Sequence, residues 1–597
     1  MVKLIDVTYP DGSLSNLSKM YKELLFALFI MAVVLVFQPN KASAATINVD
    51  AGNAAINSGD SVCNLEEAAE NINNSANTFT DCTATGAYGT NDTINLPSGT
   101  INGGSGSGIG ISFSKATKVL GQGRDESILD NVGLNIWGSG FPGTDFTLQD
   151  FKTNSQISAS SANKVTIQNI EITEDFGVGS GVGIVIRNII NATISDSYIH
   201  DADIYYDAAI GLEISPGSGL GSGFTGTYNI NDVTISNVNG LGIFTGLEYD
   251  GGTLNVSISN TTIDKVDWAA IGNSVFQGEL NITSTNNTIG EVLYEAGSGS
   301  GSGLDIHYGI LDIVNDDGTA SINHTFQNNI FASGDGNDVS NYQQLSGSGL
   351  LPVPGNNSPY ISVTSLGGNV SSDASFASKL TNAKDKNNVT NLASFLGILS
   401  SNGGSVPTLA LKSGSPAIDA GTVAGSVTTD ARGLARPQGG AYDAGAYELP
   451  SAFTINPDSD TIGLNGVPVI SSLPTFSGSA IPGSTVVVEV HSDVVTCSAT
   501  ATSNGSWSCT LPSSLPAGTH TVNILITYPD GSTTELGPYQ VLVAADEATT
   551  ITSDNLANTG VNTKLTTLIA GILALSSGAT SLIRRKLKYK LKTGYKD

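Results

Sequence analysis

Two histidines and several aspartates lie in three short stretches near the middle of the 597-residue chain. The stretches read IHDADIYYDAAIG (199–211), DKVDWAAIG (264–272) and LDIHYGILD (304–312). Carboxylates and histidines are the groups that transfer protons when a glycosidic bond is hydrolysed. The candidate catalytic residues are therefore His200, Asp203, Asp207, Asp264 and Asp267, and Trp268, Asp305 and His307 are candidates to join them. The alternative interpretation is that all of them are solvent-facing residues of a repeated structure.

Basic residues are scarce around these stretches. Arg187 and Lys265 are the only lysines or arginines between residues 165 and 378. A polysaccharide lyase needs a cation to neutralise the uronate and stabilise the enediolate, so this scarcity argues against a lyase. Inverting hydrolysis needs only carboxylates and stays open. The sequence favours a protein without catalytic activity, with a glycan-cleaving enzyme as the alternative.

A repeated pattern of strands would have to position these side chains. Several segments combine a β-branched triplet, a polar pair with Asn or Asp and a further apolar residue, as in VTIQNIEIT, ATISDSYI, VTISNVNGLGI, VSISNTTI and HTFQNNIF. The polar position falls at Asn169, Asp196, Asn237, Asn260, Asn286 and Asn328, in steps of 27, 41, 23, 26 and 42 residues. Such a period is typical of a solenoid, and the β-branched content predicts a right-handed parallel β-helix. Asparagines stacked at one corner would hydrogen-bond from coil to coil.

Gly/Ser runs account for the two longest steps. GSGLGSG (217–223) and GSGSGSG (297–303) fall within them, which predicts excursions at fixed corners of coils of just over twenty residues. A sandwich array is the alternative, but it needs tight hairpin turns such as Asn-Gly, and few occur. The predicted fold class is all-β: a parallel β-helix, then a β-sandwich and a C-terminal transmembrane sorting helix.

The chain between residues 45 and 556 is strongly acidic. It holds 13 of the 25 Lys and Arg residues and 49 of the 53 Asp and Glu residues, which leaves a formal charge near −36. Such a surface repels nucleic acid and anionic lipid, so we expect no nucleic-acid partner. Gly, Ser, Thr and Asn are abundant, as in proteins built from short strands and tight turns.

The four cysteines fall into two distant pairs. Cys63 and Cys82 lie near the start of the acidic region, whereas Cys497 and Cys509 lie more than 400 residues later. Four cysteines allow three connectivities, and this spacing favours the two local bridges. Each bridge closes a short loop and contributes about 3 kcal/mol by constraining the unfolded chain. We expect structural disulfides of an extracytoplasmic protein.

The two ends carry sequences typical of an exported and anchored protein. An apolar stretch over residues 24–37 follows two lysines and precedes small residues, which predicts a signal peptide over residues 1–44, with Met1 or Met20 as the start. Near the C-terminus, Leu565 to Ile583 approaches the length of a bilayer span and a basic tail follows it. The pentapeptide just before it is Leu556, Ala557, Asn558, Thr559 and Gly560.

Pentapeptide, span and tail together resemble a Gram-positive cell-wall sorting signal, with LAxTG in place of the usual LPxTG. The resemblance implies that a sortase cleaves between Thr559 and Gly560 and joins the threonine to peptidoglycan. A plain membrane anchor is the alternative.

The N-terminal flank of the predicted solenoid contains the segments SVCNLEEAAENIN (61–73), DC (81–82) and TNDTINLPSGTI (90–101). Together they resemble the CSLREA motif of secreted β-helix proteins, with Glu66 where a basic residue is usual. The matching positions are Cys63, Leu65, Glu67, Ala68, Cys82, Asp92, Thr93, Ile94, Leu96, Pro97 and Gly99. We expect LEEAAENI to form a short helix that closes the first coil.

The C-terminal flank resembles the choice-of-anchor Q domain that closes the same proteins. The similarity covers PTLALKSGSPAIDAG (407–421), TTDARGLARP (428–437) and DAGAYE (443–448). We expect ion pairs that close the last coil among Asp419, Asp430, Arg432, Arg436, Asp443 and Glu448.

After residue 451 the pattern changes to alternating segments with turn residues at about every ten positions, which resembles a bacterial Ig-like domain. A bridge between Cys497 and Cys509 would clamp the hairpin around residues 503–506, and Trp507 is expected to pack rather than to stack on a sugar. Such a domain serves as a spacer. The predicted domains are 1–44 signal peptide, 45–105 N-terminal cap, 106–400 β-helix, 401–450 closing motif, 451–545 Ig-like domain and 546–597 sorting signal.

These features predict a cell-wall-anchored surface protein that displays a β-helix for adhesion or for binding extracellular glycans or proteins. A surface polysaccharide lyase or glycoside hydrolase is the first alternative, and a structural coat or stalk protein is the second. The implied partners are a sortase, peptidoglycan, an extracellular ligand and, before sorting, the membrane. No cofactor or metal is predicted, and calcium is the alternative without a clear motif, since GDGNDVSN (334–341) begins like a calcium loop but lacks an oxygen ligand at Val339 and a closing glutamate.

Overall fold

The computed structural model describes residues 44–543 apart from 90, 106–107, 139–143, 174–182, 203–207, 215–222, 248–250, 294–307, 316–317, 334–339, 347–358, 413, 451–453, 456–468, 492–493, 503–504, 530 and 532. The predicted signal peptide up to residue 43 and the predicted sorting signal lie outside the described residues.

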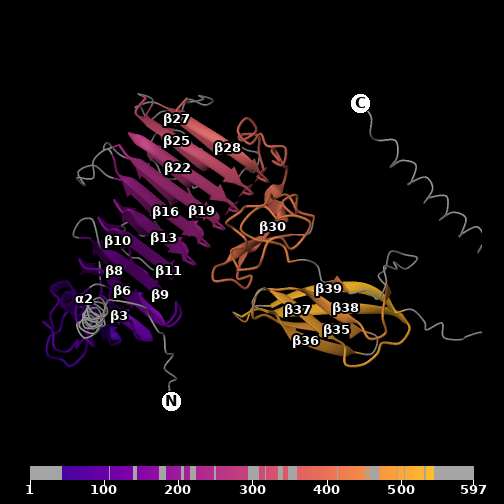
Figure 1. Cartoon of the computed structure of the whole chain (residues 1–597), viewed down its shortest axis with the longest axis horizontal. Coiled ribbons are helices and arrows are strands. Elements are labelled where there is room, and N and C mark those ends of the chain that lie inside the picture. Colours follow the sequence, from indigo (N-terminus) through magenta and orange to yellow (C-terminus); the bar gives the residue numbers. More distant parts are fainter. Residues whose placement is uncertain are drawn as a thin grey trace, which may run out of the picture.

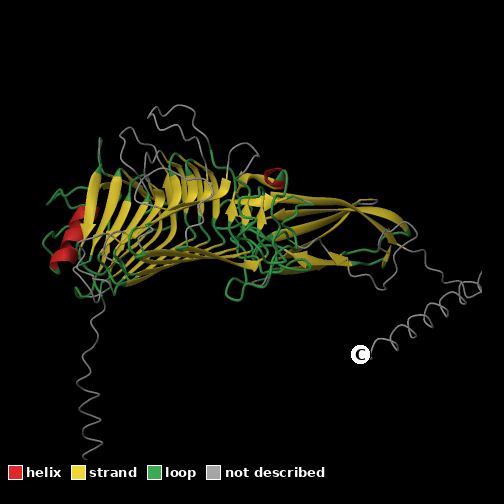
Figure 2. Cartoon of the chain, turned by 90° about the horizontal axis from the view of Figure 1, so that it is seen from above, coloured by secondary structure: helices red, strands yellow, loops and turns green. Residues whose placement is uncertain are grey.

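Most of the chain from Thr46 to Ser371 forms parallel strands stacked in three columns (Figures 1 and 2). Two columns belong to a 20-stranded sheet and the third is a nine-stranded sheet. The first column contains β1 (Thr46–Asn48), β3 (Asp92–Asn95), β6 (Thr117–Leu120), the first parts of β9 (Asp145–Thr153) and β11 (Lys164–Thr173), β13 (Asn191–Ser195), β16 (Thr225–Asn231), β19 (Thr253–Ser259), β22 (Gly278–Thr285), β25 (Ala320–Gln327) and β28 (Ile361–Gly367).

The other two columns follow the same order along the chain. The second contains β2 (Gly52–Asn53), β4 (Gly99–Asn102), β7 (Ser127–Asp130), the second parts of β9 and β11, β14 (Tyr198–Ala202), β17 (Thr234–Val238), β20 (Thr262–Val266), β23 (Thr288–Ile289), β26 (Ile330–Phe331) and β29 (Val370–Ser371). The third contains β5 (Ile109–Phe113), β8 (Val132–Trp137), β10 (Ile157–Ser160), β12 (Ile184–Arg187), β15 (Ala208–Ile214), β18 (Leu241–Leu247), β21 (Ala269–Val275), β24 (Tyr308–Val314) and β27 (Ser340–Ser346).

The chain visits the three columns in turn, so each coil pairs with the coil before it and the coil after it. Every second residue of a strand points inward, as Val165, Ile167, Ile170 and Ile172 of β11 do. Because these β-branched side chains fill the space between the sheets, each coil extends one continuous apolar core. This all-β, parallel-stranded arrangement fits the expected β-helix.

The turn from the first to the second column is made by a residue with positive φ. In seven successive coils this residue is Asp150, Asn169, Asp196, Asp232, Asn260, Asn286 and Asn328. Asn and Asp tolerate this left-handed conformation better than other residues with a Cβ atom. Their side chains form hydrogen bonds between coils. Asn169 Nδ2 donates to Asp150 Oδ1 (2.6 Å), and Asn260 Nδ2 donates to Asp232 Oδ1 (3.0 Å).

The structure corrects two details of the predicted repeat. Asn237 does not occupy this corner, because it lies within β17, and Asp232 occupies it instead. The sequence pattern matched both residues because each comes near the same β-branched segment. The two Gly/Ser runs also belong to different turns, since residues 217–223 lie between β15 and β16 and residues 297–303 between β23 and β24.

A second row of asparagines is buried beside the corner. The Oδ1 atoms of Asn287, Asn329 and Asn369 accept backbone N–H groups from Thr261 (2.9 Å), Asn287 (3.0 Å) and Asn329 (3.0 Å) of the preceding coils. Strand pairing is interrupted at the turn between the first and second columns, so these buried backbone N–H groups have no partner in the sheet. The asparagine side chains accept their hydrogen bonds instead.

The N-terminal end of the stack is covered by the helix α2 (Leu65–Asn74), as predicted for LEEAAENI (Figure 2). Leu65 and Ile72 of this helix join the apolar core, and a disulfide bond between Cys63 and Cys82 lies beside it. Strands β1 to β4 belong to the same columns as the later strands, so the predicted boundary at residue 105 does not coincide with a structural one.

Residues 372–450, which we call the return segment, first cover the last coil and then run back along the side of the stack (Figure 1). The segment contains η1 (Leu392–Phe395) and a small sheet of β30 (Leu396–Ser400) and β31 (Thr408–Leu411). It contacts successive corner residues: Ser405 Oγ donates to Asp196 Oδ1 (3.1 Å), and the carbonyl oxygens of Thr429 and Thr422 accept from Asn260 (3.0 Å) and Asn328 (2.7 Å). The parallel strands therefore end at Ser371, before the predicted limit at residue 400.

Four of the six charged residues predicted in this segment form two buried ion pairs. Arg432 contacts Asp430 (2.6 Å) and Arg436 contacts Glu448 (2.7 Å). The other two, Asp419 and Asp443, accept backbone N–H groups instead. These groups stabilise the return segment beside the stack, and the last coil is covered by Phe376, which packs against Phe326 and Phe331.

The C-terminal region is an antiparallel sandwich of two sheets apart from the parallel pair of β33 and β39. One sheet contains β32 (Thr454–Ile455), β34 (Thr475–Ser479) and β37 (Ser506–Thr510), and the other contains β33 (Val469–Ile470), β39 (Thr533–Val543), β38 (Gly518–Thr527), β35 (Thr485–His491) and β36 (Val495–Thr500). The disulfide bond joins Cys497 of β36 to Cys509 of β37. The bridge therefore links the two sheets, and the predicted hairpin clamp is wrong because the chain crosses between the sheets there.

Within the described ranges, no helix has the length and apolar character needed to cross a membrane. The predicted span from Leu565 to Ile583 lies outside those ranges.

Candidate functional site

Two of the predicted site residues, His200 and Asp264, lie in one row on the outer side of the second column. The pairing of β14, β17 and β20 places His200, Ser236 and Asp264 one after another along the stack. A neighbouring row is formed by Lys152 on β9, Glu171 on β11 and Tyr198 on β14. Asp203, Asp207, Asp305 and His307 lie outside the described residues.

Glu171 is the centre of a network of charged side chains that we call the Glu171 cluster: Lys152, Glu171, Tyr198, His200 and Asp201. Glu171 Oε1 lies 2.5 Å from Lys152 Nζ and 3.3 Å from His200 Nε2. The other ring nitrogen of His200, Nδ1, lies 2.7 Å from Asp201 Oδ2. The ring of Tyr198 stacks on the imidazole with 3.9 Å between centroids. Both nitrogens of His200 therefore contact a carboxylate, and these contacts favour the protonated imidazole.

The pKa values of the cluster follow from these contacts. Burial alone would raise the pKa of the Glu171 carboxyl, but hydrogen bonds from His200 and Lys152 and their positive charges lower it from 4.5 to about 2. For His200, burial disfavours the charged form, yet the hydrogen bonds to Glu171 and Asp201 raise its pKa above the ordinary 6.5. Glu171 thus stays ionised at neutral pH and has no proton to donate as a general acid.

Asp264 and Asp267 are buried rather than exposed on the outer surface. Asp264 Oδ1 accepts the backbone N–H of Glu291 (2.9 Å) in the next coil, and a Cβ atom at Gly290 would lie 2.2 Å from this oxygen. Burial raises the pKa of Asp264, although the bond from Glu291 opposes the rise. Asp264 therefore connects two coils and fits tightly beneath the return segment, whose Leu409 is a further neighbour of Gly290.

The spacing of the described carboxylates decides what chemistry they can perform together. Glu171 and Asp264 are three coils apart, which is about 14 Å at the usual spacing of parallel strands. The carboxyl pair of an inverting glycosidase is about 6.5–9.5 Å apart. Glu171 and Asp264 therefore cannot flank one glycosidic bond.

Lys152, Glu171 and Tyr198 were not among the predicted site residues. Each comes from a different coil, and their sequence separations of 19 and 27 residues carry no motif. The signal that would have found them is the alignment of coils on the corner residues, since Glu171 and Tyr198 both follow their corner residue by two positions.

Trp268 is half exposed at the end of the turn that follows β20, and it has positive φ (58°). An aromatic residue in this conformation is strained unless the surrounding structure holds it there. Two hydrogen bonds do so: the carbonyl of Trp268 accepts from Tyr308 N (2.9 Å), and Asp267 N donates to Val238 O (3.1 Å). Pairing with both neighbouring coils therefore fixes this turn.

Among the described residues, no three His, Cys, Asp or Glu side chains are arranged to hold a metal ion.

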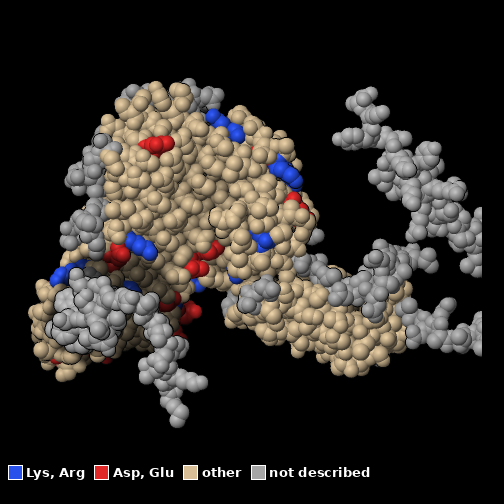
Figure 3. Space-filling view, in the orientation of Figure 1, with Lys and Arg blue, Asp and Glu red and all other residues tan. Residues whose placement is uncertain are grey.

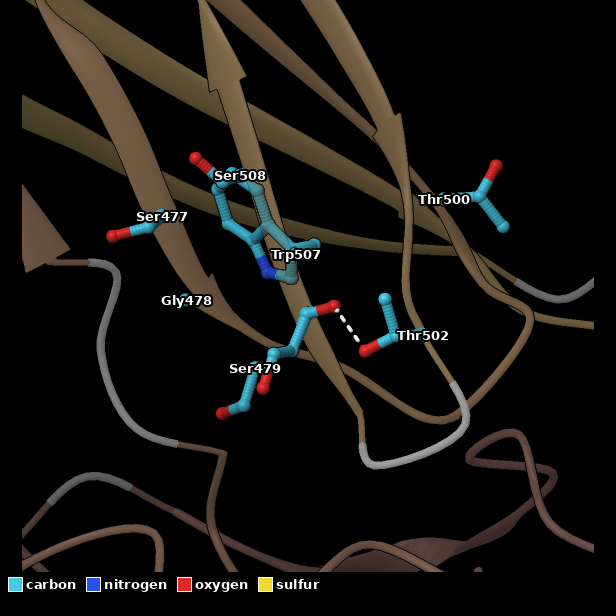
Figure 4. A pocket seen from close by; sticks show the side chains of 8 residues that line it. Ser477, Gly478, Ser479, Thr500, Thr502, Trp507 and Ser508 are labelled. Carbon is cyan, nitrogen blue, oxygen red and sulfur yellow. Dashed lines mark hydrogen bonds between the residues drawn. The ribbon is translucent and has the colours of Figure 1, made fainter.

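A second concave site lies in the C-terminal sandwich. It is a groove of about 710 Å³ lined by Ser477, Gly478, Ser479, Thr500, Thr502, Ser506, Trp507 and Ser508 (Figure 4). The groove and the two disulfide-linked sheets are the main structural features of this C-terminal region. Residues 450–546 match the family model of the bacterial Ig-like domain. No curated protein shows significant sequence similarity to the chain.

The Ig-like domain confirms the prediction made for residues 451–545. Trp507 of this domain is only 5% exposed, and a Cβ atom at Gly478 would lie 3.0 Å from its indole ring. The ring therefore packs against β34 and offers no open face on which a sugar could stack. The groove of the Ig-like domain is polar at its rim, with its one aromatic residue buried in the floor.

Proposed function

We propose that the chain is a cell-wall-anchored surface protein whose right-handed parallel β-helix binds extracellular glycans or proteins, with the Ig-like domain as a spacer. The LAxTG sorting signal at residues 556–560 would attach it to peptidoglycan through a sortase. Segments that resemble the CSLREA and choice-of-anchor Q motifs, at residues 61–101 and 407–448, support the same assignment.

The observation that carries the proposal is the outer surface of the stacked strands. Parallel strands from Thr46 to Ser371 give it long rows of side chains in register, next to an Ig-like domain. The ionisable groups of the Glu171 cluster neutralise one another, so they are suited to hold coils together. A rigid surface of this length favours contact with an extended or repeated partner. Two disulfide bonds suit an oxidising, extracytoplasmic setting.

The proposal is tested by binding of the purified protein to a panel of acidic and neutral polysaccharides and matrix proteins, with and without calcium. We expect saturable retention on at least one member and no new reducing or unsaturated ends. Newly formed ends would assign polysaccharide cleavage instead. A complete lack of saturable binding would favour a coat or stalk.

The anchoring part of the proposal is tested by Thr559→Ala in the sorting pentapeptide. The unchanged protein should be released from cells by peptidoglycan hydrolases, and the variant should stay with the membrane. If both proteins are released equally, the proposed sortase attachment is wrong.

A further inference from the structure

Over four successive coils, two outward rows of the first column consist only of Thr, Ser and Asn, whereas the same rows contain Lys118, Asp145 and Lys164 in earlier coils. They cross β16, β19, β22 and β25, where the register aligns Thr227, Asn255, Asn281 and Asn323 in one row and Asn229, Ser257, Thr283 and Thr325 in the other. We call these residues the hydroxyl–amide face. Figure 3 shows almost no charged side chains over this part of the molecule. Ser362 and Thr364 of β28 continue the two rows.

The face is a regular array because both of its spacings are set by the backbone. Neighbouring coils are about 4.8 Å apart, and side chains two residues apart on a strand are about 6.7 Å apart. The amide row is further held by its own hydrogen bonds, in which Asn281 Nδ2 donates to Asn255 Oδ1 (3.1 Å) and Asn323 Nδ2 to Asn281 Oδ1 (3.0 Å). Inward residues between the rows, such as Val256 and Ile282, are fully packed in the core. The array is therefore rigid before any partner binds.

The composition of the face is unusual for the surface of an acidic protein. The whole chain has a formal charge of −28, yet Glu279 is the only charged residue at the outward positions of β16, β19, β22 and β25. Soluble surfaces ordinarily mix many Lys, Glu, Asp and Arg side chains. Hydroxyl and amide groups both donate and accept hydrogen bonds, and they lose less than charged groups when water is displaced.

This chemistry selects among the partners that the proposed function leaves open. An anionic polymer would be repelled by the acidic protein and would find no basic group on the face. A protein interface of ordinary affinity has aromatic or large apolar residues at its centre, and these rows have none. A neutral polysaccharide presents hydroxyl groups at regular intervals and needs neither charge nor a large apolar pocket.

We propose that the hydroxyl–amide face binds an extended neutral polysaccharide that lies along the rows and exchanges hydrogen bonds with them from coil to coil. The inference rests on the proposed function, of which it names the ligand class and the binding surface.

The absence of aromatic residues from these rows has a consequence for affinity. A hydrogen bond to a neutral hydroxyl adds little net free energy, because both groups were hydrogen-bonded to water before. Useful affinity then requires many repeated contacts along one chain. Long polymers should therefore be retained while fragments of a few sugars compete poorly. Salt should have little effect because the two rows carry no charge themselves, and their one charged neighbour on these four strands is Glu279, which accepts a hydrogen bond from Asn323 (3.1 Å).

The experiment measures retention of the full protein on cellulose, chitin and cross-linked dextran at low and high salt, with cellotetraose as the short competitor and polygalacturonate as the anionic polymer. Thr283 is exposed on the face, so Thr283→Lys should weaken retention about tenfold or more by placing a charge against a neutral ligand. Thr283→Val keeps the β-branched shape, so it serves as the second variant if Thr283→Lys disturbs folding. It removes only the hydroxyl group and should weaken retention by a smaller factor. Thr496→Lys is the matched control on an exposed position of the Ig-like domain and should have no effect.

The outcomes separate this inference from the proposed function. Salt-insensitive retention on a neutral polymer that Thr283→Lys weakens and Thr496→Lys leaves intact supports the face. Retention that both variants leave intact, or that occurs only on polygalacturonate, overturns the face while surface binding stands. No retention on any neutral polymer overturns the inference, whereas the proposed function fails only if the whole panel is not bound. Shaping of ice crystals without polysaccharide retention would assign the face to ordered water and overturn the proposal as well.

Discussion

Replacing Glu171 by Gln should cost the protein about 2 kcal/mol of its free energy of unfolding at about pH 5.5. The carboxyl contacts both Lys152 and His200, and these contacts lower its pKa from 4.5 to about 2. A shift of this size corresponds to about 3 kcal/mol, and partial exposure of the side chain, 17%, reduces it through solvent screening. Glutamine keeps the size of the side chain but removes the charge that both cations need.

The pH dependence gives the test its direction. The pKa of Glu171 is lowered in the folded protein, so its contribution is present above 4.5 and is lost as the pH falls toward 2. The pKa of His200 is raised, so its contribution is present below 6.5 and is lost as the pH rises through the raised value. The difference between the two proteins should therefore be largest between about pH 4.5 and 6.5.

The measurement is urea unfolding followed by circular dichroism over a pH series. Glu291→Gln is the matched control, since Glu291 is exposed on the turn after β23 and should change stability by less than about 0.5 kcal/mol. A Glu171→Gln variant that matches this control at every pH would refute the role of the Glu171 cluster in joining coils.

Two further predictions concern contacts between coils, and both are measured by denaturant or thermal unfolding. Asn329→Ala removes a buried side-chain amide whose oxygen accepts the backbone N–H of Asn287, and it should lower the free energy of unfolding by about 2–3 kcal/mol. Asn281→Ala, in the partly exposed row, should lower it by less than about 1 kcal/mol. Equal losses would contradict the role of the buried row. Gly290→Ala would place a Cβ atom 2.2 Å from Asp264 Oδ1 and should lower the free energy of unfolding by about 1–3 kcal/mol. Gly425→Ala is the control and should leave stability unchanged, because a Cβ atom there would have no neighbouring atom within 4 Å. If Gly290→Ala is tolerated equally well, the return segment packs more loosely on the stack than the structure shows.

Some of the site could be predicted from residues close together in sequence. The polar pair that recurs beside each β-branched triplet predicts the positions Asn169, Asp196 and Asn260. The structure supplies the physical reason, since a left-handed turn at this corner favours Asn or Asp. His200 was singled out because a histidine among aspartates is conspicuous. Its partners were not, since Glu171 becomes its neighbour only when two coils stack in one particular register.

The course of the return segment is a second feature that local sequence did not reveal. Its charges suggested ion pairs, and Arg432 and Arg436 do form them, but where the segment lies depends on surfaces made by other coils. Thr429 meets Asn260 across 169 residues of sequence, a contact that no local pattern encodes. The disulfide of the Ig-like domain is a similar case. The spacing of the cysteines predicted that Cys497 pairs with Cys509, but it did not reveal that the bond links two different sheets.

The amino-acid sequence by itself determined that the chain is all-β, that coils repeat, that a short helix covers the first coil and that an Ig-like domain follows, because side-chain period, β-branching and turn residues act over a few neighbouring residues. Only the tertiary structure decided which side chains share a row. Insertions of different length separate the coils, so register is set by packing of the common core rather than by counting residues. For that reason the Glu171 cluster and the hydroxyl–amide face, each assembled from several coils, became visible only once the strands were stacked.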